Sequence, residues 1–160
     1  MPLGFGQKKT ALTAAIKVSS LLDAKGREVF ALSPRDTVYD AIAMMSEKHV
    51  GALLVMEGEA LVGIISERDY ARKVILCGRS SKDTPIAEIM SAPVIFVSPD
   101  ATVDECMRIM TEQRVRHLPV VDNGRVVGVI SIGDLVRVII SEQAQTIDHL
   151  HAYIHGSYPA

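Results

Sequence analysis

Two stretches of the chain, Val62-Gly-Ile-Ile-Ser-Glu-Arg-Asp69 and Val127-Gly-Val-Ile-Ser-Ile-Gly-Asp134, share one pattern of apolar residues, glycine, serine and aspartate. They stand 65 residues apart (134 − 69 = 65). The same offset aligns Val29–Ile75 with Val94–Ile140 without a gap. An ungapped match of this length indicates that the chain contains a duplicated unit.

Each repeat has the same expected order of elements. In the first repeat, Val38, Ala41, Ile42 and Met45 follow the spacing of one helical face, and Thr37 stands before them as an N-cap. Turn residues between short apolar runs indicate a hairpin in each repeat. The expected strands are Val29–Leu32, Ala52–Met56 and Leu61–Ile65 in the first repeat, and Ile95–Val97, Leu118–Val121 and Val126–Ile130 in the second.

The order β-α-β-β-α, present twice, predicts an α+β fold of two tandem repeats. A repeat of roughly 47 residues is marginal alone. We therefore expect the two repeats to be related by a pseudo-twofold, to pack through their sheets and to form two equivalent clefts. Outside the repeats we expect a helix over Thr13–Ala24 beside the first repeat and a short helix over Pro85–Met90. The predicted division is a segment 1–18, repeat 19–78, linker 79–84, repeat 85–145 and tail 146–160.

Composition narrows the class of protein. The 160 residues are 48% hydrophobic and 4% aromatic with a net charge of −2, which does not suit a nucleic-acid-coating protein. Only Cys77 and Cys106 are present, which favours a reducing, cytoplasmic setting. No apolar run approaches the ~18 residues of a membrane span. We expect a cytoplasmic protein that contacts neither membrane nor nucleic acid.

The Ser-x-x-Asp endings admit two interpretations. Ser66 with Asp69, and Ser131 with Asp134, stand where a buried strand runs into a helix. The pattern alone favours a capping box, in which serine and aspartate satisfy the first backbone N–H groups of the helix. The same junction could bind phosphate at its N–H groups and ribose hydroxyls at its carboxylate. The duplication at equivalent positions, together with the family resemblance described next, favours this second interpretation.

Arg116-His-Leu-Pro-Val-Val-Asp122 together with Val127–Asp134 resembles a CBS motif, the family named from cystathionine β-synthase. Gly51–Val55 with Val62–Asp69 resembles its partner. From about Ser19 to Ile140 the chain is similar to small stand-alone bacterial proteins made of a CBS pair, or Bateman module. The resemblance implies a regulatory module that senses adenosine nucleotides in the clefts between repeats. AMP is the favoured ligand, with ADP, ATP or NAD(H) as alternatives, and no catalytic cofactor is implied.

The resemblance also implies the site residues. The serines and aspartates of both junctions would meet ribose and phosphate, Arg68, Arg116 and His117 would meet phosphate, and Gly133 would leave room beside Asp134. An apolar slot would take the adenine. The implied ligand-binding set is Ser66, Arg68, Asp69, Arg116, His117, Ser131, Gly133 and Asp134, with Phe30, Ile64, Ile95 and Val129 at the adenine.

Two other classes of function were weighed. A ligand-independent homodimerisation module could use the apolar helix Leu135–Ile140. An enzyme is disfavoured, because no set of nucleophile, base and oxyanion donors can be assembled from the sequence. The histidines of the tail, His149, His151 and His155, have no metal-site spacing. A sensor of this kind requires a regulated protein partner, which the sequence does not name.

Overall fold

The computed structural model describes residues 15–142, whose contacts form two compact units. Within the described range, unit 1 comprises residues 15–26, 98–118 and 130–142, and unit 2 comprises residues 27–97 and 119–129. Both helices and strands are present in a mixed α+β arrangement, as expected. The units do not coincide with the two sequence repeats, and this difference decides which residues meet at each site.

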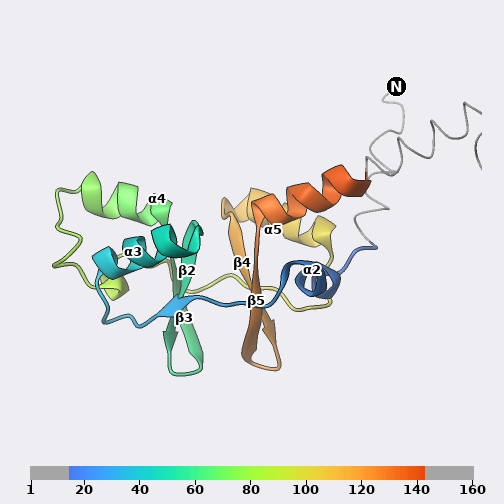
Figure 1. The fold of residues 1–160 in the computed structure, drawn as a ribbon, viewed down its shortest axis with the longest axis horizontal. Helices are drawn as coiled ribbons and strands as arrows, with labels where there is room; N and C mark the ends of the chain where they lie inside the picture. Colours follow the sequence, from blue (N-terminus) through green and yellow to red (C-terminus); the bar gives the residue numbers. More distant parts are fainter. Residues whose placement is uncertain (1–14, 143–160) are drawn as a thin grey trace, which may run out of the picture. The chain divides into compact units, whose positions relative to one another are not determined.

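Unit 2 contains a three-stranded sheet in the order β1-β2-β3. Strand β1 (Ala31–Leu32) pairs in parallel with β2 (Ala52–Glu57), which pairs antiparallel with β3 (Ala60–Ser66). Helix α3 (Val38–Lys48) begins at the expected N-cap Thr37, whose side chain accepts from the backbone of Asp40 in a capping box. Figure 1 shows α3 and α4 grouped beside the β2–β3 hairpin, with the hairpin turn projecting away from them.

Three short elements complete unit 2. Helix α4 (Glu67–Tyr70) follows β3 directly and passes into a π-helical turn, η1 (Ala71–Ile75). A 3-10 helix, η2 (Ile86–Glu88), lies within the segment for which a short helix was expected. Because π-helical turns insert an extra residue into a helix, η1 changes the direction of the side chains that follow α4.

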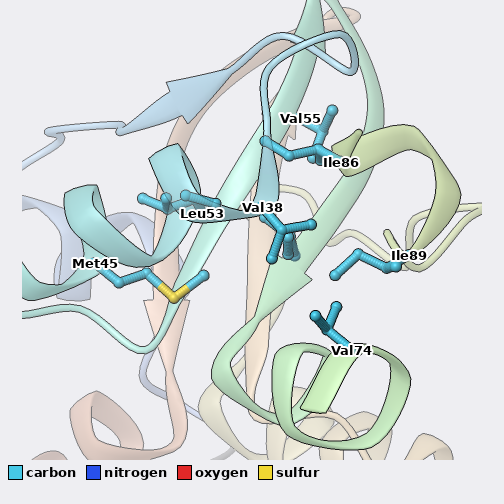
Figure 2. Close-up of a cluster of buried hydrophobic side chains, with 9 residues drawn as sticks. Val38, Met45, Leu53, Val55, Val74, Ile86 and Ile89 are labelled. Carbon is cyan, nitrogen blue, oxygen red and sulfur yellow. The ribbon is translucent and has the colours of Figure 1, made fainter. Parts of the chain in front are cut away.

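The core of unit 2 is aliphatic, as the low aromatic content requires. Helix α3 contributes Val38, Ala41 and Met45, all at most 2% exposed, and Ile42, the fourth residue of the predicted stripe, is partly buried against them. Figure 2 shows these side chains converging with others from β2, η1 and η2. The remaining members of the cluster are Leu53, Val55, Ile65, Val74, Ile86 and Ile89.

Unit 1 is built around two helices and part of a hairpin. Helix α2 spans Val18–Lys25 and α5 spans Val103–Gln113. Strands β4 (His117–Asp122) and β5 (Arg125–Ser131) form a two-stranded sheet, and a further helix begins at residue 132 and continues to residue 142, where the described range ends. Buried side chains come from every one of these elements: Val18, Leu21, Leu22, Val103, Cys106, Met110, Leu118, Ile130 and Leu135.

The placement of α2 corrects an expectation. A helix beside the first repeat was expected, but α2 packs with α5 of the second repeat. Val18 N–H donates to the Ala101 carbonyl at 2.8 Å, and Val103 N–H donates to the Ile16 carbonyl at 2.9 Å. The helix also begins later than expected, at Val18, because the extended backbone of Lys17 forms a β-bridge with Thr102. Residues 13 and 14 lie outside the described range.

Unit 2 shows the reciprocal arrangement. The segment that precedes the aligned residues 94–140 of the second repeat packs with the first repeat: Ile86 N–H donates to the Asp36 carbonyl at 2.8 Å, and Val38 N–H donates to the Thr84 carbonyl at 2.9 Å. The segment preceding each repeat therefore completes the core of the other repeat. We call this arrangement the segment exchange.

The strand expected over Ile95–Val97 is also wrong, since only a single parallel bridge joins Val97 to Val120. In the first repeat, Leu54 N–H donates to the Phe30 carbonyl at 3.1 Å. The residue 65 positions after Leu54 is Pro119, which has no N–H to donate to Ile95. One bond of the ladder is thereby lost, and the strand is reduced to a bridge.

Candidate functional site

The strand-to-helix junction of unit 1 is a capping box. Ser131 N–H donates to Asp134 Oδ2 at 2.8 Å, and Asp134 N–H donates to Ser131 Oγ at 3.3 Å. Ile132 N–H donates to the Arg116 carbonyl at 2.8 Å, which holds the Arg116–His117 segment beside the turn. The capping interpretation of the sequence pattern is confirmed, and the box fixes the direction of the Asp134 carboxylate.

The Asp134 side chain is only 4% exposed and is surrounded by cations. Lys25 Nζ, at the end of α2, lies 2.6 Å from Asp134 Oδ2, and Arg137 donates to Oδ1 from the next turn of the same helix. Burial by itself raises the pKa of the Asp134 carboxyl, but hydrogen bonds from Lys25, Ser131 and Arg137 outweigh it. The pKa therefore lies below its ordinary value, and Asp134 is a carboxylate at neutral pH.

His117 is half-buried in this site. Burial lowers the pKa of its imidazole, the negative charge of Asp134 opposes that effect, and the positive charges of Lys25 and Arg116 add to it. His117 therefore favours the neutral form in the folded protein. Ser131, Gly133 and Asp134 belong to this junction, and the Arg116 carbonyl binds it through Ile132 N–H; the predicted contact of these residues and His117 with ligand stays a prediction.

The junction of unit 2 repeats the capping box with different surroundings. Ser66 N–H donates to Asp69 Oδ2 at 3.0 Å, and Asp69 N–H donates to Ser66 Oγ at 3.2 Å. Lys73 Nζ lies 3.1 Å from Asp69 Oδ1 and also donates to the Ile89 carbonyl at 2.9 Å. Ser91 Oγ donates to Asp69 Oδ1 at 3.4 Å.

The lysine that contacts the aspartate thus comes from a different part of the chain in each of the two junctions. Lys73 is four residues beyond Asp69, whereas Lys25 is separated from Asp134 by 109 positions. Sequence reasoning named neither contact, and Lys73 is exposed on its helix although it pairs with Asp69. The i,i+4 spacing of Asp69 and Lys73 on a helix was an available signal. Nothing in the local sequence indicates the Lys25 contact, since it follows from the segment exchange.

The remaining predicted residues lie in or beside these elements. Phe30 is half-buried against the unit 2 core, with Lys48 Nζ 5.3 Å from the centre of its ring. Ile64 is half-buried in β3, and its backbone bonds to Ser91 in both directions. A Cβ added at exposed Gly133 would meet only Ser131 Oγ, at 3.6 Å, so this side of the turn is open. Ile95 and Val129 are half-buried and Arg68 is exposed.

Neither a metal-binding cluster nor a membrane-spanning helix is present among the described residues. Between residues 15 and 142, no cluster of three or more His, Cys, Asp or Glu side chains could hold a metal ion. In the same range, no helix is long and apolar enough to cross a bilayer. The tail histidines His149, His151 and His155 lie outside the described residues.

Comparison with known proteins identifies the fold. The family model of the CBS domain matches residues 23–75 and 86–141. The mitochondrial CBS domain-containing protein CBSX3 of Arabidopsis thaliana is 41% identical over 150 residues, covering 88% of this chain and 73% of the relative. A solved Burkholderia ambifaria protein with CBS domains is 53% identical with a TM-score of 0.77, covering 79% of this chain and 96% of that one.

A hexameric CBS-CP12 protein from bloom-forming cyanobacteria is 28% identical with a TM-score of 0.69, covering 76% of this chain and 70% of that one. Proteins that consist of CBS domains are generally regulatory rather than catalytic, and their paired domains generally bind adenosine ligands. The matched ranges place one CBS domain on each sequence repeat, so the chain belongs to the CBS-domain family as a tandem CBS pair.

Proposed function

We propose that this CBS pair senses adenine nucleotides, with AMP as the favoured ligand and ADP, ATP or NAD(H) as alternatives. The observation that carries the proposal is the setting of Asp134. Its carboxylate is buried, ionised and fixed in direction by the capping box, it pairs with the cations Lys25 and Arg137, and Arg116 and the neutral imidazole of His117 come from the neighbouring segment. A carboxylate for ribose hydroxyls beside cations for phosphate is the chemistry that a nucleotide requires.

The capping role and a ribose contact are compatible. An ionised carboxylate offers about four acceptor positions, and the Ser131 N–H uses one of them. The helix N-terminus at the junction adds a partial positive charge that favours a phosphate nearby. The equivalent junction of unit 2, with Ser66 and Asp69, supports a second site of weaker positive charge, because Gly51 and Ala52 stand where unit 1 has Arg116 and His117.

Regulation requires that the ligand binds one conformation more tightly than another. We propose that occupancy of the sites changes the stability or arrangement of the repeats and that a partner protein reads this change. We also propose a reducing, cytoplasmic setting, which agrees with the free thiols of Cys77 and Cys106. The compartment of the Arabidopsis relative, whose name says mitochondrial, is a property of that protein.

Thermal unfolding with millimolar AMP, ADP, ATP or NAD(H) tests the proposal. A ligand present at 100 times its Kd adds about 2.7 kcal/mol to the stability of the folded state, which raises Tm by several degrees. We expect such a shift in the wild-type protein and a much smaller one in Asp134→Ala. Asp100→Ala is the matched control, because Asp100 is an exposed carboxylate of the same unit. If no ligand moves the wild-type melting curve, the proposal is wrong.

A second candidate function is self-association. Val136 and Ile140, one turn apart on the helix that begins at residue 132, are 41% and 58% exposed. Exposed aliphatic residues with this spacing suit a homodimer contact, and the cyanobacterial relative is described as hexameric. Analytical ultracentrifugation of Val136→Glu/Ile140→Glu tests this role. A wild-type protein that is already monomeric at micromolar concentration excludes it.

A further inference from the structure

The two junctions share one backbone arrangement and differ in one titratable side chain. In unit 1 the first backbone N–H after β5 donates to the Arg116 carbonyl at 2.8 Å, and in unit 2 the first N–H after β3 donates to the Gly51 carbonyl at 3.1 Å. The next residue opens a strand in each unit, and it is His117 in unit 1 and Ala52 in unit 2. An imidazole, which can gain a proton near neutral pH, therefore stands in the unit 1 site where unit 2 has a methyl group.

Positive charges come to His117 from three directions. Lys25 ends α2, Arg116 precedes His117 in the chain, and Arg114 ends α5 three residues earlier. The imidazole is also half-buried, and an imidazolium at this position would lose part of its hydration. Burial lowers the pKa of His117 most, and the charges of Lys25 and Arg116 lower it further.

Asp134 brings the opposing negative charge, but cations already bind its carboxylate. Lys25 Nζ lies 2.6 Å from Oδ2, and Arg137 donates to Oδ1. The charge of Asp134 raises the pKa of His117, yet burial and the cations outweigh it, so the pKa lies below its ordinary value. In the folded protein His117 is therefore a neutral side chain placed among charged ones.

A bound phosphate would change this balance. A phosphate monoester carries close to two negative charges at pH 7.5, and an opposite charge within about 4–6 Å moves a titration by roughly 1–3 pH units. The proton comes from solvent and stays on the imidazole, whose imidazolium form then makes a charge-assisted bond to a phosphate oxygen. We propose, on the basis of the function proposed above, that the unit 1 site takes up a proton at His117 when it binds the phosphate of a nucleotide.

This proton uptake makes the unit 1 site respond to pH as well as to nucleotide. A ligand that binds together with a proton binds more tightly as the pH falls, and an uptake of roughly 0.3 proton changes its Kd about twofold per pH unit. Adenosine has no phosphate, so its affinity should stay constant between pH 8 and pH 7. The unit 2 site, with Ala52 in place of His117, should bind without taking up a proton.

Isothermal titration of the wild-type protein at pH 7.5 tests the inference, in two buffers that differ in their heat of ionisation. The difference between the two binding heats gives the number of protons taken up. We expect roughly 0.3 proton or more for AMP and close to none for adenosine. His117→Gln should abolish the uptake with AMP. His49→Gln is the matched control, because His49 is an exposed histidine that ends α3 in the other unit, and it should keep the wild-type uptake.

A second variant keeps the test independent of the first. His117→Arg carries a permanent charge, so it should bind AMP without proton uptake and with a Kd that stays constant between pH 7 and pH 8. Circular dichroism verifies the fold of each variant.

The outcomes separate the two proposals. If the wild-type protein binds neither AMP nor adenosine, the proposed function is wrong and the inference falls with it. If AMP binds and His117→Gln takes up as many protons as the wild-type protein, His117 is not the acceptor and the proposed function stands. Equal uptake with adenosine and with AMP would show that the phosphate is not the cause, which also overturns the inference.

Discussion

Gly63 in β3 faces Met90 so closely that a Cβ added at Gly63 would lie 2.4 Å from Met90 Sδ and 2.9 Å from its Cγ. Two backbone hydrogen bonds between Ile64 and Ser91, at 3.1 and 2.8 Å, fix this approach. Because Gly63 has no side chain, the segment that precedes the second repeat can pack close against the sheet of the first repeat.

Gly63→Ala should destabilise the protein by about 1–3 kcal/mol, because the methyl group meets the inner part of the Met90 side chain. Urea unfolding measures the effect. In Gly63→Ala/Met90→Ala the added methyl group has space, so the double variant should lose less than the sum of the two single losses. Gly133→Ala, whose Cβ meets only Ser131 Oγ at 3.6 Å, should change stability by no more than about 0.5 kcal/mol. Additive losses in the double variant would contradict the contact.

Thr102→Ala should cost about 1 kcal/mol, since it removes the N-cap of α5. Thr102 Oγ1 accepts from Glu105 N–H at 3.1 Å, and Glu105 Oε2 accepts from Thr102 N–H at 3.2 Å. Denaturant unfolding gives the difference. Thr111→Ala removes an exposed hydroxyl from the same helix, where it donates to the Met107 carbonyl, and is expected to be near neutral. Equal losses in the two variants would show that capping is not the cause.

His117 should make stability depend on pH. Its folded-state pKa lies below the ordinary value of about 6.5, so the unfolded chain binds the proton more tightly. The associated stability is complete above about pH 6.5 and is lost as the pH falls toward the folded-state pKa. His117→Gln should therefore flatten the decrease in unfolding free energy between pH 7 and pH 5.

Denaturant unfolding at several pH values measures this slope. His49→Gln is the control, because His49 is an exposed histidine that ends α3 in the other unit. The control should keep the slope of the wild-type protein. A His117→Gln variant with an unchanged slope would assign the pH dependence to other groups.

The two cysteines should react at very different rates. Cys77 is exposed, whereas Cys106 is buried in α5 and its burial raises the pKa of the thiol to about 11. Only the thiolate reacts, so a thiol reagent at pH 8 should label one group in the native protein and two in denaturant. Cys77→Ser should abolish the fast phase. Rapid labelling of Cys106 in the folded protein would contradict the packing of α5 in unit 1.

The sequence predicted the helices, hairpins and caps better than it predicted which segments pack together. The helical stripe of α3, the hairpin of each repeat and the Ser-x-x-Asp capping boxes depend on residues close together in the chain, and the structure has all of them. The lost strand at Ile95 could also have been predicted, because Pro119 stands at the position where the first repeat donates an N–H.

The pairing of Lys25 with Asp134 could not be predicted in the same way. In a duplicated chain the segment before each repeat has two equivalent surfaces to pack on, and local patterns do not distinguish them. The hydrogen bonds of Ile16 and Val18 to residues 101 and 103 decide the choice. The charge balance of the candidate site follows from that choice, which is why sequence reasoning found the aspartate and missed its counter-ion.

The segment exchange also constrains how such a protein can be divided. A chain cut between its repeats would leave each half with an uncovered apolar face and with a helix whose packing surface lies on the missing half. Two copies of a single half could still cover both apolar faces if each copy packed its segment on the other copy. In one polypeptide the exchange is intramolecular, so it does not depend on protein concentration.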